Sequence, residues 1–232
     1  EGVVVEEPWD MQSSELWERG AIMGQSRASM LVARVTGPEP GQRVLDLCAA
    51  PGAKTTHLAA LMEGRGEVVA VERHPGRAAA LERTAERMRA DCVRVHVGDA
   101  LEPPGRGFDR VLIDPPCSGL GTLQSRPDRR WRATPDSLEV LAELQAGILT
   151  AGVGALAPGG RLVYSVCTIS RREGEGVVSR VLGGDPDFEA EDLGAAYPQW
   201  RDRHDPRHLQ LLPHRERTDG FFIASLRRRV AH

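Results

Sequence analysis

The stretch RVLDLCAAPGAKTTHLAALM, residues 43–62, decides the fold. Its apolar start, residues 43–47, predicts a buried strand, and residues 55–62 predict a helix. Small residues make up the loop between them, so its backbone can approach a ligand closely and its amides can donate hydrogen bonds. The loop lacks the G-x-x-x-x-G-K-[ST] spacing of a phosphate-binding loop, although Gly52 and Lys54 resemble part of that motif.

Strand-like and helix-like segments alternate around this unit. The other expected strands are residues 67–72, 92–97, 108–114 and 161–166, and the other expected helices are residues 26–35, 77–89 and 137–156. The sequence PGG at 158–160 is expected to stop the last helix. Repeated strand–helix units predict an α/β fold in which helices cover both faces of a parallel sheet.

The composition is that of one globular domain. The chain has 232 residues, of which 41% are hydrophobic and 27% are charged. No apolar run approaches the roughly 20 residues of a membrane span, and no secretory signal opens the chain, so we expect a cytoplasmic protein without a membrane partner. Its four cysteines form no C-x-x-C pair, so we expect neither a metal site nor a disulfide framework. We favour a monomer.

Acidic residues follow three of the predicted strands. Glu72 ends the second strand, Asp99 follows the third and Asp114 follows the fourth. In open α/β sheets the ligand lies beyond the carboxyl ends of the strands. Taken singly, each acid is more often a cap or a solvated loop residue. Together with the small-residue loop, they outline a nucleoside site without phosphate-binding features, which suits S-adenosylmethionine.

Five motifs resemble those of a known family. They are DLCAAPGAKT (46–55), GDA (98–100), FDRVLIDPPCSGLGTL (108–123), LVYSVCTI (162–169) and TDGFF (218–222). These segments resemble the RNA cytosine-C5 methyltransferases, most closely the RsmB/Sun (Fmu) group acting on small-subunit ribosomal RNA. GQSRASMLVARV (24–35) is similar to the segment that precedes the family's cofactor loop. The resemblance runs in the family's order over about residues 20–226.

The resemblance implies a fold and a division of the chain. The fold is a Rossmann-like, S-adenosylmethionine-dependent methyltransferase fold, whose mostly parallel sheet ends in an antiparallel strand at residues 220–226. Residues 1–40 would be an N-terminal connecting segment and residues 41–232 the methyltransferase domain. Family members often carry an upstream RNA-binding domain. Because the chain starts at Glu1 without a methionine, we expect that domain to be absent and RNA binding to be weak.

The resemblance also implies residue roles. The methionine end of the cofactor would be bound by the loop residues Cys48, Ala49, Ala50, Pro51, Gly52, Ala53 and Lys54, with Cys48 contributing its backbone. Glu72 would hold the ribose, and Asp99 would lie near the adenine. Asp114 would face the target base and also belong to the cofactor-binding residues. Cys117 would assist breakdown of a covalent intermediate, and Cys167 would be the nucleophile. Cys92 is interpreted as structural.

Four positions depart from the family's pattern. Ala53 stands where glycine is usual, Pro116 follows Pro115 where one small residue and one proline are usual, and Val166 replaces the threonine before the nucleophile. EGE at 173–175 replaces the typical E-N-E. None of these changes removes a functional group that the reaction needs.

Methylation of cytosine at carbon 5 can employ two thiols, one as the nucleophile and one that helps to release the product. Carbon 5 of cytosine is too weak a nucleophile to take a methyl group directly, so a thiolate first adds at carbon 6. An acid near N3 and the exocyclic amine, the position suited to Asp114, would stabilise the adduct. A second polar group is then needed to help remove the carbon 5 proton. Cys117, on the loop after Asp114, could serve directly or through water.

A basic segment is the candidate RNA contact. The net charge of −3 gives no overall signal for nucleic acid, so a basic surface must be local. SRPDRRWRATP (125–135) groups Arg126, Arg129, Arg130, Trp131 and Arg132. Arginines contact phosphates and aromatic rings stack on unpaired bases. A capped surface loop with internal ion pairs explains the same pattern equally well. A target cytosine must be unstacked, so looped RNA is expected over a duplex.

Alternative functions stay open. A cytosine-C5 methyltransferase could act on tRNA or on DNA; in the DNA enzymes a Pro-Cys thiol such as Cys117 is itself the nucleophile, but Cys167 and the DGFF ending speak against this. Amino-nitrogen methyltransferases carry an aromatic residue after Asp-Pro-Pro, where this chain has Cys117. A noncatalytic scaffold would bind S-adenosylmethionine or RNA and transfer no methyl group.

Overall fold

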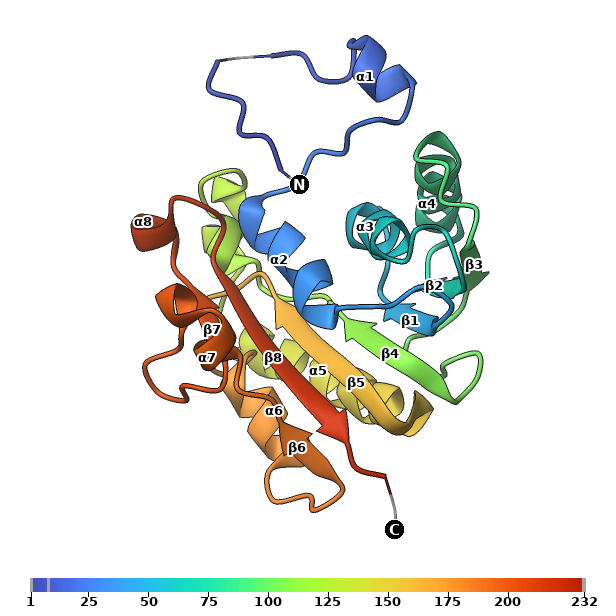
Figure 1. The fold of residues 1–232 in the computed structure, drawn as a ribbon. Helices are drawn as coiled ribbons and strands as arrows, with labels where there is room; N and C mark the ends of the chain where they lie inside the picture. The colour runs from blue at the N-terminus through green and yellow to red at the C-terminus, as the bar shows by residue number, and fades with distance from the viewer. Residues whose placement is uncertain (1, 8, 231–232) are drawn as a thin grey trace.

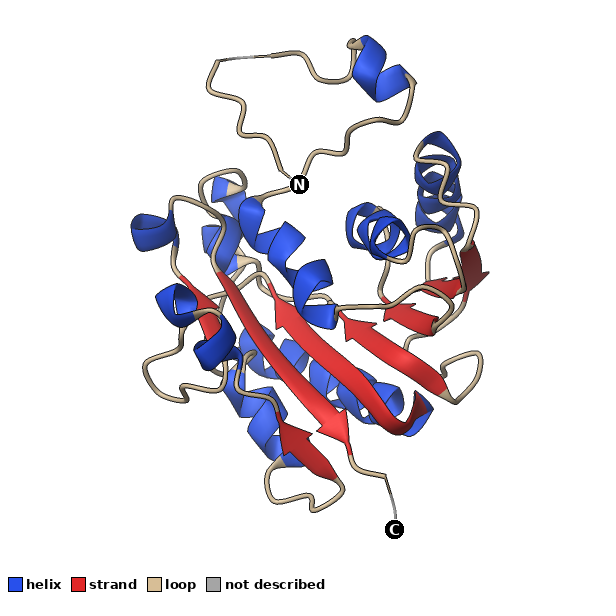
Figure 2. Ribbon diagram, viewed as in Figure 1, coloured by secondary structure: helices blue, strands red, loops and turns tan. Residues whose placement is uncertain are grey.

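One mixed sheet organises the chain. The computed structural model describes residues 2–7 and 9–230; Glu1, Pro8 and the last two residues, which the expected domain limits include, lie outside it. The sheet order is β3-β2-β1-β4-β5-β8-β6, with β7 paired to β8 (Figures 1 and 2). The strands of this described part are β1 Arg43–Leu47, β2 Glu67–Glu72, β3 Val93–Val97, β4 Phe108–Ile113, β5 Leu156–Val166, β6 Phe188–Ala190, β7 Leu209–Leu211 and β8 Phe221–Arg228.

The strand directions confirm the expected fold class. β1 pairs in parallel with β2 and β4, β2 with β3, and β4 with β5. β8 pairs antiparallel with β5, as the final strand was expected to do, and β6 and β7 pair antiparallel with β8. The chain therefore has the α/β, mostly parallel sheet of the S-adenosylmethionine-dependent methyltransferases, closed by antiparallel strands.

Helices cover both faces of the sheet (Figure 1). The helices are α1 Glu15–Glu18, α2 Arg27–Thr36, α3 Ala53–Leu61, α4 Pro75–Arg87, α5 Pro135–Ala155, α6 Glu175–Leu182, α7 Leu193–Ala196 and α8 Pro213–Glu216, and the short 3₁₀ helices are η1 Leu120–Thr122, η2 Pro127–Trp131 and η3 Pro198–Trp200. Buried residues of α2, α3 and α4 form one cluster with the sheet, and those of α5 and α6 form another. Strand residues alternate between the two: Leu112 is in the first cluster, while Val111 and Ile113 are in the second.

α2 is part of this core. Ser26 caps its first turn by accepting from the Ser29 amide, and Gly37 ends it with a φ of 54°. Leu31, Val32 and Val35 are buried against the sheet. α2 thus packs with the sheet although it precedes residue 41, where the domain was expected to begin; that boundary stays a prediction.

α5 matches the expected helix in length to within one residue, but it contains a longer apolar stretch than expected from the sequence. It has 21 residues, and an 18-residue stretch of it has a mean hydropathy of 1.3, so by length and composition alone it could cross a membrane. Its buried residues, among them Ile148 and Leu149, pack against β4, β5 and α6. α5 is therefore placed as a core helix of the fold.

α5 ends at Ala155, before the PGG sequence that was expected to stop it, and PGG lies inside the next strand. β5 begins at Leu156, five residues earlier than expected. Phe108 pairs with Leu156 and Arg110 with Arg161, so residues 157–160 form an irregularity in the ladder. Glycine and proline are tolerated in a strand at such a bulge.

Glu191, just after β6, links this end of β6 to β5 and β8, a connection that the sequence pattern did not predict. Its carboxylate accepts from Arg161 Nε of β5 at 2.6 Å, and from Ser225 Oγ at 2.5 Å and Arg227 Nη2 at 3.0 Å, both of β8. Burial raises the pKa of Glu191, but the hydrogen bonds from Arg161, Ser225 and Arg227 outweigh burial and lower it from 4.5 to about 2. The ionised form is therefore the one that stabilises the fold.

Glu191→Gln should lower the free energy of unfolding at neutral pH by about 2 kcal/mol, allowing for solvent screening of this half-buried group. The contribution is complete above pH 4.5 and disappears as pH falls towards about 2. Denaturant unfolding of both proteins across this range measures it. A stability difference that stays constant down to pH 2 would contradict the assignment.

Candidate active site

The strand ends meet at one edge of the sheet, where the strand order reverses between β1 and β4. Leu47 of β1 pairs with Ile113 of β4, which pairs with Tyr164 of β5. Cys48 and Asp114 directly follow the paired residues of β1 and β4. Cys167 lies three residues beyond the paired residue of β5. The sheet therefore brings the small-residue loop, the acid and both candidate thiols to the position where open α/β sheets bind their ligands.

The loop after β1 folds tightly onto the start of α3. The Ala49 amide donates to the Val71 carbonyl of β2 at 2.9 Å, and the Gly52 amide donates to the Ala49 carbonyl at 2.9 Å. Gly52 has a φ of 104°, and a Cβ there would lie 2.5 Å from Leu81 Cδ1, so only glycine fits. The loop thus consists of backbone and small side chains at the edge of the sheet, and its expected contact with the cofactor stays a prediction.

Asp46 lies beneath this loop and was not assigned a role from the sequence. It is fully buried and accepts a hydrogen bond of 2.7 Å from Thr55 Oγ1 at the start of α3. Burial raises the pKa of Asp46 to about 7, against the lowering effect of Thr55. Asp46 joins the end of β1 to the first turn of α3, which is the turn that carries Lys54.

Glu72 and Asp99 differ in their surroundings. The Glu72 carboxylate is buried; it accepts from the His74 amide at 2.9 Å and lies 3.4 Å from the Arg77 guanidinium. Arg77 also donates to the Ala50 carbonyl, so it joins Glu72 to the small-residue loop. Asp99 is more exposed and accepts from the Leu101 amide. A buried carboxylate at this position can accept hydrogen bonds from the ribose hydroxyls of a ligand such as S-adenosylmethionine. It lies beside a loop of small residues, whose backbone a ligand can approach closely.

Lys54 and Asp114 form an ion pair at the switch point. Lys54 Nζ lies 2.7 Å from Asp114 Oδ2, and Ser165 Oγ of β5 donates to Asp114 Oδ1 at 3.1 Å. Burial alone would lower the pKa of Lys54, but the charge and hydrogen bond of Asp114 outweigh burial and raise it above 10.5. The only lysine of the chain therefore stays charged inside the site, next to the acid expected to face the base.

The two candidate thiols touch. Cys117 Sγ and Cys167 Sγ are 3.2 Å apart and are not joined by a disulfide. The hydrogen bond from Cys117 outweighs burial and lowers the pKa of Cys167, whereas the same contact raises the pKa of Cys117 well above 9.0. The contact thus favours the thiolate form at Cys167 and the protonated thiol at Cys117. A thiolate is the nucleophilic form of cysteine.

The other two cysteines have different surroundings. Burial raises the pKa of Cys48 to about 12, so its thiol stays protonated at neutral pH. Cys92 is buried just before β3 in the first core cluster. Their expected backbone and structural roles stay predictions. Among residues 2–7 and 9–230, no group of three or more His, Cys, Asp or Glu side chains is arranged to hold a metal ion.

The basic segment splits in two. Arg126, Arg130, Trp131 and Arg132 are exposed, with Trp131 81% accessible and Arg130 5.6 Å from its ring centre. Arg129 instead turns inward and donates to the Cys117 carbonyl at 3.3 Å. Arg132 pairs with Asp128, as the alternative of a surface loop with internal ion pairs expected. RNA contact by these residues stays a prediction, and Arg129 has an additional place beside the thiol loop.

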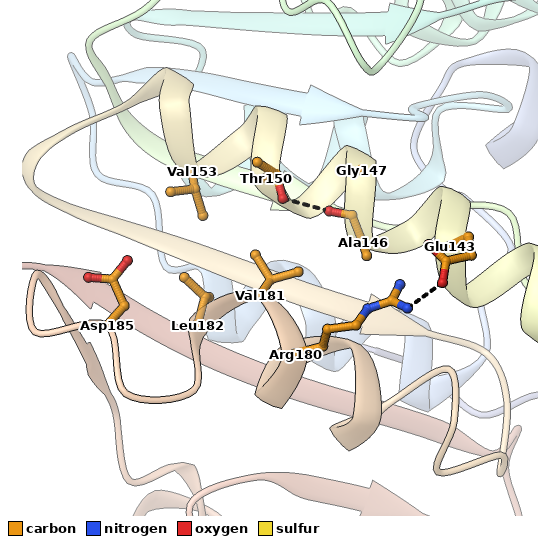
Figure 3. Close-up of a pocket in the computed structure, with 9 residues that line it drawn as sticks. All are labelled: Glu143, Ala146, Gly147, Thr150, Val153, Arg180, Val181, Leu182 and Asp185. Atoms are coloured by element: carbon orange, nitrogen blue, oxygen red, sulfur yellow. Dashed lines mark hydrogen bonds and ion pairs between the residues drawn. The ribbon is translucent and has the colours of Figure 1, made fainter.

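A groove between α5 and α6 lies apart from this site. Its cavity is about 760 Å³, and Figure 3 shows Arg180 reaching across it to Glu143. The ion pair is 2.6 Å long. The groove contains neither the thiols nor the strand-end acids, so we assign it no part in the chemistry.

Comparison with known proteins identifies relatives. The model of a family described as 16S rRNA methyltransferase RsmB/F matches residues 33–227. A probable ribosomal RNA small subunit methyltransferase B of Synechocystis sp. is 39% identical over 209 residues, which are 88% of this chain and 47% of that protein. A tRNA (cytosine(72)-C(5))-methyltransferase of Pyrococcus horikoshii is 34% identical over 214 residues, which are 91% of this chain and 54% of that protein.

A solved structure agrees with these matches. The crystal structure of NSun6 from Pyrococcus horikoshii with SFG has a TM-score of 0.86 to this chain at 32% identity, covering 95% of this chain and 56% of that one. The chain therefore spans about half the length of the relatives that it matches.

Cys117→Ala should raise the pKa of Cys167, because the hydrogen bond that lowers it is lost. We expect the pH midpoint of Cys167 reactivity to rise by about one pH unit. Alkylation of Cys167 by iodoacetamide from about pH 6 to 10, followed by peptide mass spectrometry, measures the midpoint. Cys92→Ala is the control and should leave it unchanged. An unchanged midpoint in Cys117→Ala would show that the thiols do not share a proton.

Proposed function

Because this chain belongs to the 16S rRNA methyltransferase RsmB/F family, we propose that it transfers a methyl group from S-adenosylmethionine to carbon 5 of a cytosine in RNA. The family is one of S-adenosylmethionine-dependent RNA 5-methylcytosine methyltransferases, as the sequence analysis expected. The observation that carries the proposal is the 3.2 Å contact of Cys117 and Cys167 beside the Lys54–Asp114 ion pair.

The cofactor would be held by the loop after β1 and by Glu72. When bound, S-adenosylmethionine supplies the methyl group that carbon 5 attacks. The amides and small side chains of Cys48 to Lys54 would surround its methionine end, and the buried Glu72 carboxylate would accept hydrogen bonds from its ribose. Asp99, exposed near the end of β3, would lie towards the adenine.

Cys167 begins the reaction by adding as a thiolate to carbon 6 of cytosine. Electron density then increases at carbon 5, which becomes an enamine-like nucleophile, and on the ring towards N3. Asp114 is ion paired with Lys54 and so meets the base as a carboxylate, which can accept from the exocyclic amine. The positive charge of Lys54 lies next to this contact and stabilises the ring as its electron density rises.

Cys117 acts after methyl transfer. The main reason for its raised pKa is the hydrogen bond to the Cys167 sulfur. Carbon–sulfur bond formation removes the negative charge from Cys167, so the pKa of Cys117 falls once the adduct exists. Cys117 can then release its proton to solvent and, as a thiolate, accept the carbon 5 proton directly or through water. Elimination releases 5-methylcytosine and restores the Cys167 thiolate.

Small-subunit ribosomal RNA is the substrate that we propose. The matched family and the Synechocystis sp. relative carry rRNA in their names. The Pyrococcus horikoshii relative, named for a tRNA cytosine, makes tRNA the second candidate. The exposed Arg126, Arg130, Trp131 and Arg132 would contact unpaired RNA near the thiols. We further propose a cytoplasmic, monomeric enzyme whose domain begins near residue 41, with α2 packed on it, and which binds RNA more tightly with an upstream RNA-binding domain than without one.

Cys167→Ala should abolish methyl transfer, and Asp114→Asn should lower kcat by about 10²-fold because the ionised acceptor beside the base is lost. Incorporation of a labelled methyl group into RNA measures both. Cys92→Ala is the control. Cys92 lies just before β3, away from the carboxyl ends of the strands, so this variant should retain wild-type turnover. Full activity in Cys167→Ala would contradict the nucleophile assignment.

Methylation of 16S rRNA and tRNA transcripts at equal concentration, followed by bisulfite sequencing, separates the two substrates. We expect one unpaired cytosine of 16S rRNA to be converted faster, because an unpaired base reaches the thiol at a lower unstacking cost. Conversion of tRNA alone would overturn the ribosomal assignment and leave the C5 chemistry in place.

A further inference from the structure

A buried carboxylate lies directly behind the thiol pair. Glu173 is 0% exposed and lies just before α6. Its Oε1 atom accepts from the Ser118 amide at 2.8 Å and from Gln145 Nε2 at 3.1 Å. Its Oε2 atom accepts from Ser118 Oγ at 2.5 Å and from Thr168 Oγ1 at 3.2 Å. Both oxygens are thus hydrogen bonded inside the protein, which offsets the cost of burying them.

The donors are the neighbours of the thiols in the sequence. Ser118 directly follows Cys117, and Thr168 directly follows Cys167. The Ser118 and Thr168 hydroxyl oxygens are also 2.9 Å apart. One carboxylate therefore ties together the two loops, 50 residues apart in the chain, at the position next to each sulfur.

Glu173 is itself fixed in place. Tyr164 of β5 donates from its hydroxyl to the Glu173 carbonyl at 2.7 Å. Gln145 of α5 bonds Glu173 and also donates to the Pro116 carbonyl at 2.9 Å, just before Cys117. Because α5 and β5 belong to the core, the position of the carboxylate is set by the fold before any substrate binds.

We propose that Glu173 is a positioning residue that keeps Cys117 close enough to Cys167 to donate a hydrogen bond to the Cys167 sulfur, and thereby stabilises the thiolate form of Cys167. Its importance for catalysis rests on the proposed function. Its effect on the thiols does not, and can be measured without RNA or cofactor. Glu173 touches neither sulfur in the contacts above; it acts through Ser118 and Thr168.

The sign of the pKa change separates positioning from simple electrostatics. Loss of a nearby negative charge favours thiolates and so lowers thiol pKa values. Loss of the Cys117 hydrogen bond raises the pKa of Cys167 instead. A rise in Glu173→Gln therefore reports displacement of the loops and not the missing charge.

The experiment measures the pH midpoint of Cys167 alkylation, resolved by peptide mass spectrometry, in Glu173→Gln, Cys117→Ala and the double variant. Glu191→Gln is the matched control, because it also removes a hydrogen-bonded carboxylate but lies among β5, β6 and β8. Thr168→Val keeps the carboxylate, removes one donor and provides a second, milder variant if Glu173→Gln folds poorly. Thermal unfolding establishes which variants are folded.

We expect Glu173→Gln to raise the midpoint by about one pH unit, a tenfold change in the acid dissociation constant of Cys167, and Thr168→Val to raise it by about half a unit. Glu191→Gln should match the wild type. The double variant should match Cys117→Ala alone, because Glu173 acts through Cys117. A folded Glu173→Gln with an unchanged or lowered midpoint would overturn the proposal. A double variant shifted further than Cys117→Ala, or a folded Thr168→Val without any shift, would overturn it as well.

Discussion

A distance of 3.2 Å separates two cysteine sulfurs that belong to different loops, and the chemistry of the site depends on it. At this distance one thiol can donate a hydrogen bond to the other, and the contact lowers the pKa of Cys167 while it raises that of Cys117. The parallel pairing of β4 with β5 brings the two sulfurs together, because the loops that leave two paired parallel strands emerge at the same edge of the sheet. β1, on the other side of β4, adds the cofactor loop and Lys54 at that edge.

Three carboxylic acids support this arrangement, and their surroundings give them different tasks. Asp46, with its pKa raised to about 7 by burial, joins β1 to the first turn of α3 through Thr55. Asp114 is paired with Lys54 and is the acid that we propose meets the base. Glu173 is enclosed by hydrogen-bond donors from the two thiol loops and from α5. Buried polar groups are costly unless they are satisfied, so such a network restricts the loops to one arrangement.

Much of this could be predicted from sequence because it follows from local pattern. The apolar runs located β1 to β5 to within a few residues, except that β5 begins earlier through a bulge, and the strand-end rule selected Glu72, Asp114 and the loop from Cys48 to Lys54. The network at Glu173 could not be predicted, because EGE before a helix has the pattern of an exposed acidic first turn and burial depends on tertiary packing. A hydroxyl residue after each cysteine, Ser118 and Thr168, was the available signal. The inward position of Arg129 could not be predicted either. Its place in an arginine-rich segment is typical of an RNA contact, and its orientation depends on tertiary packing.

The central claim is that Cys167 forms the bond to cytosine and Cys117 releases it. The most direct measurement incubates Cys117→Ala protein with S-adenosylmethionine and cytosine-containing RNA, and then separates protein from RNA on a denaturing gel beside the Cys117→Ala/Cys167→Ala double variant. The account predicts a slower-migrating protein–RNA band in the single variant and no such band in the double variant. A band that persists in the double variant, or a Cys117→Ala protein that turns over without accumulating any adduct, would contradict it.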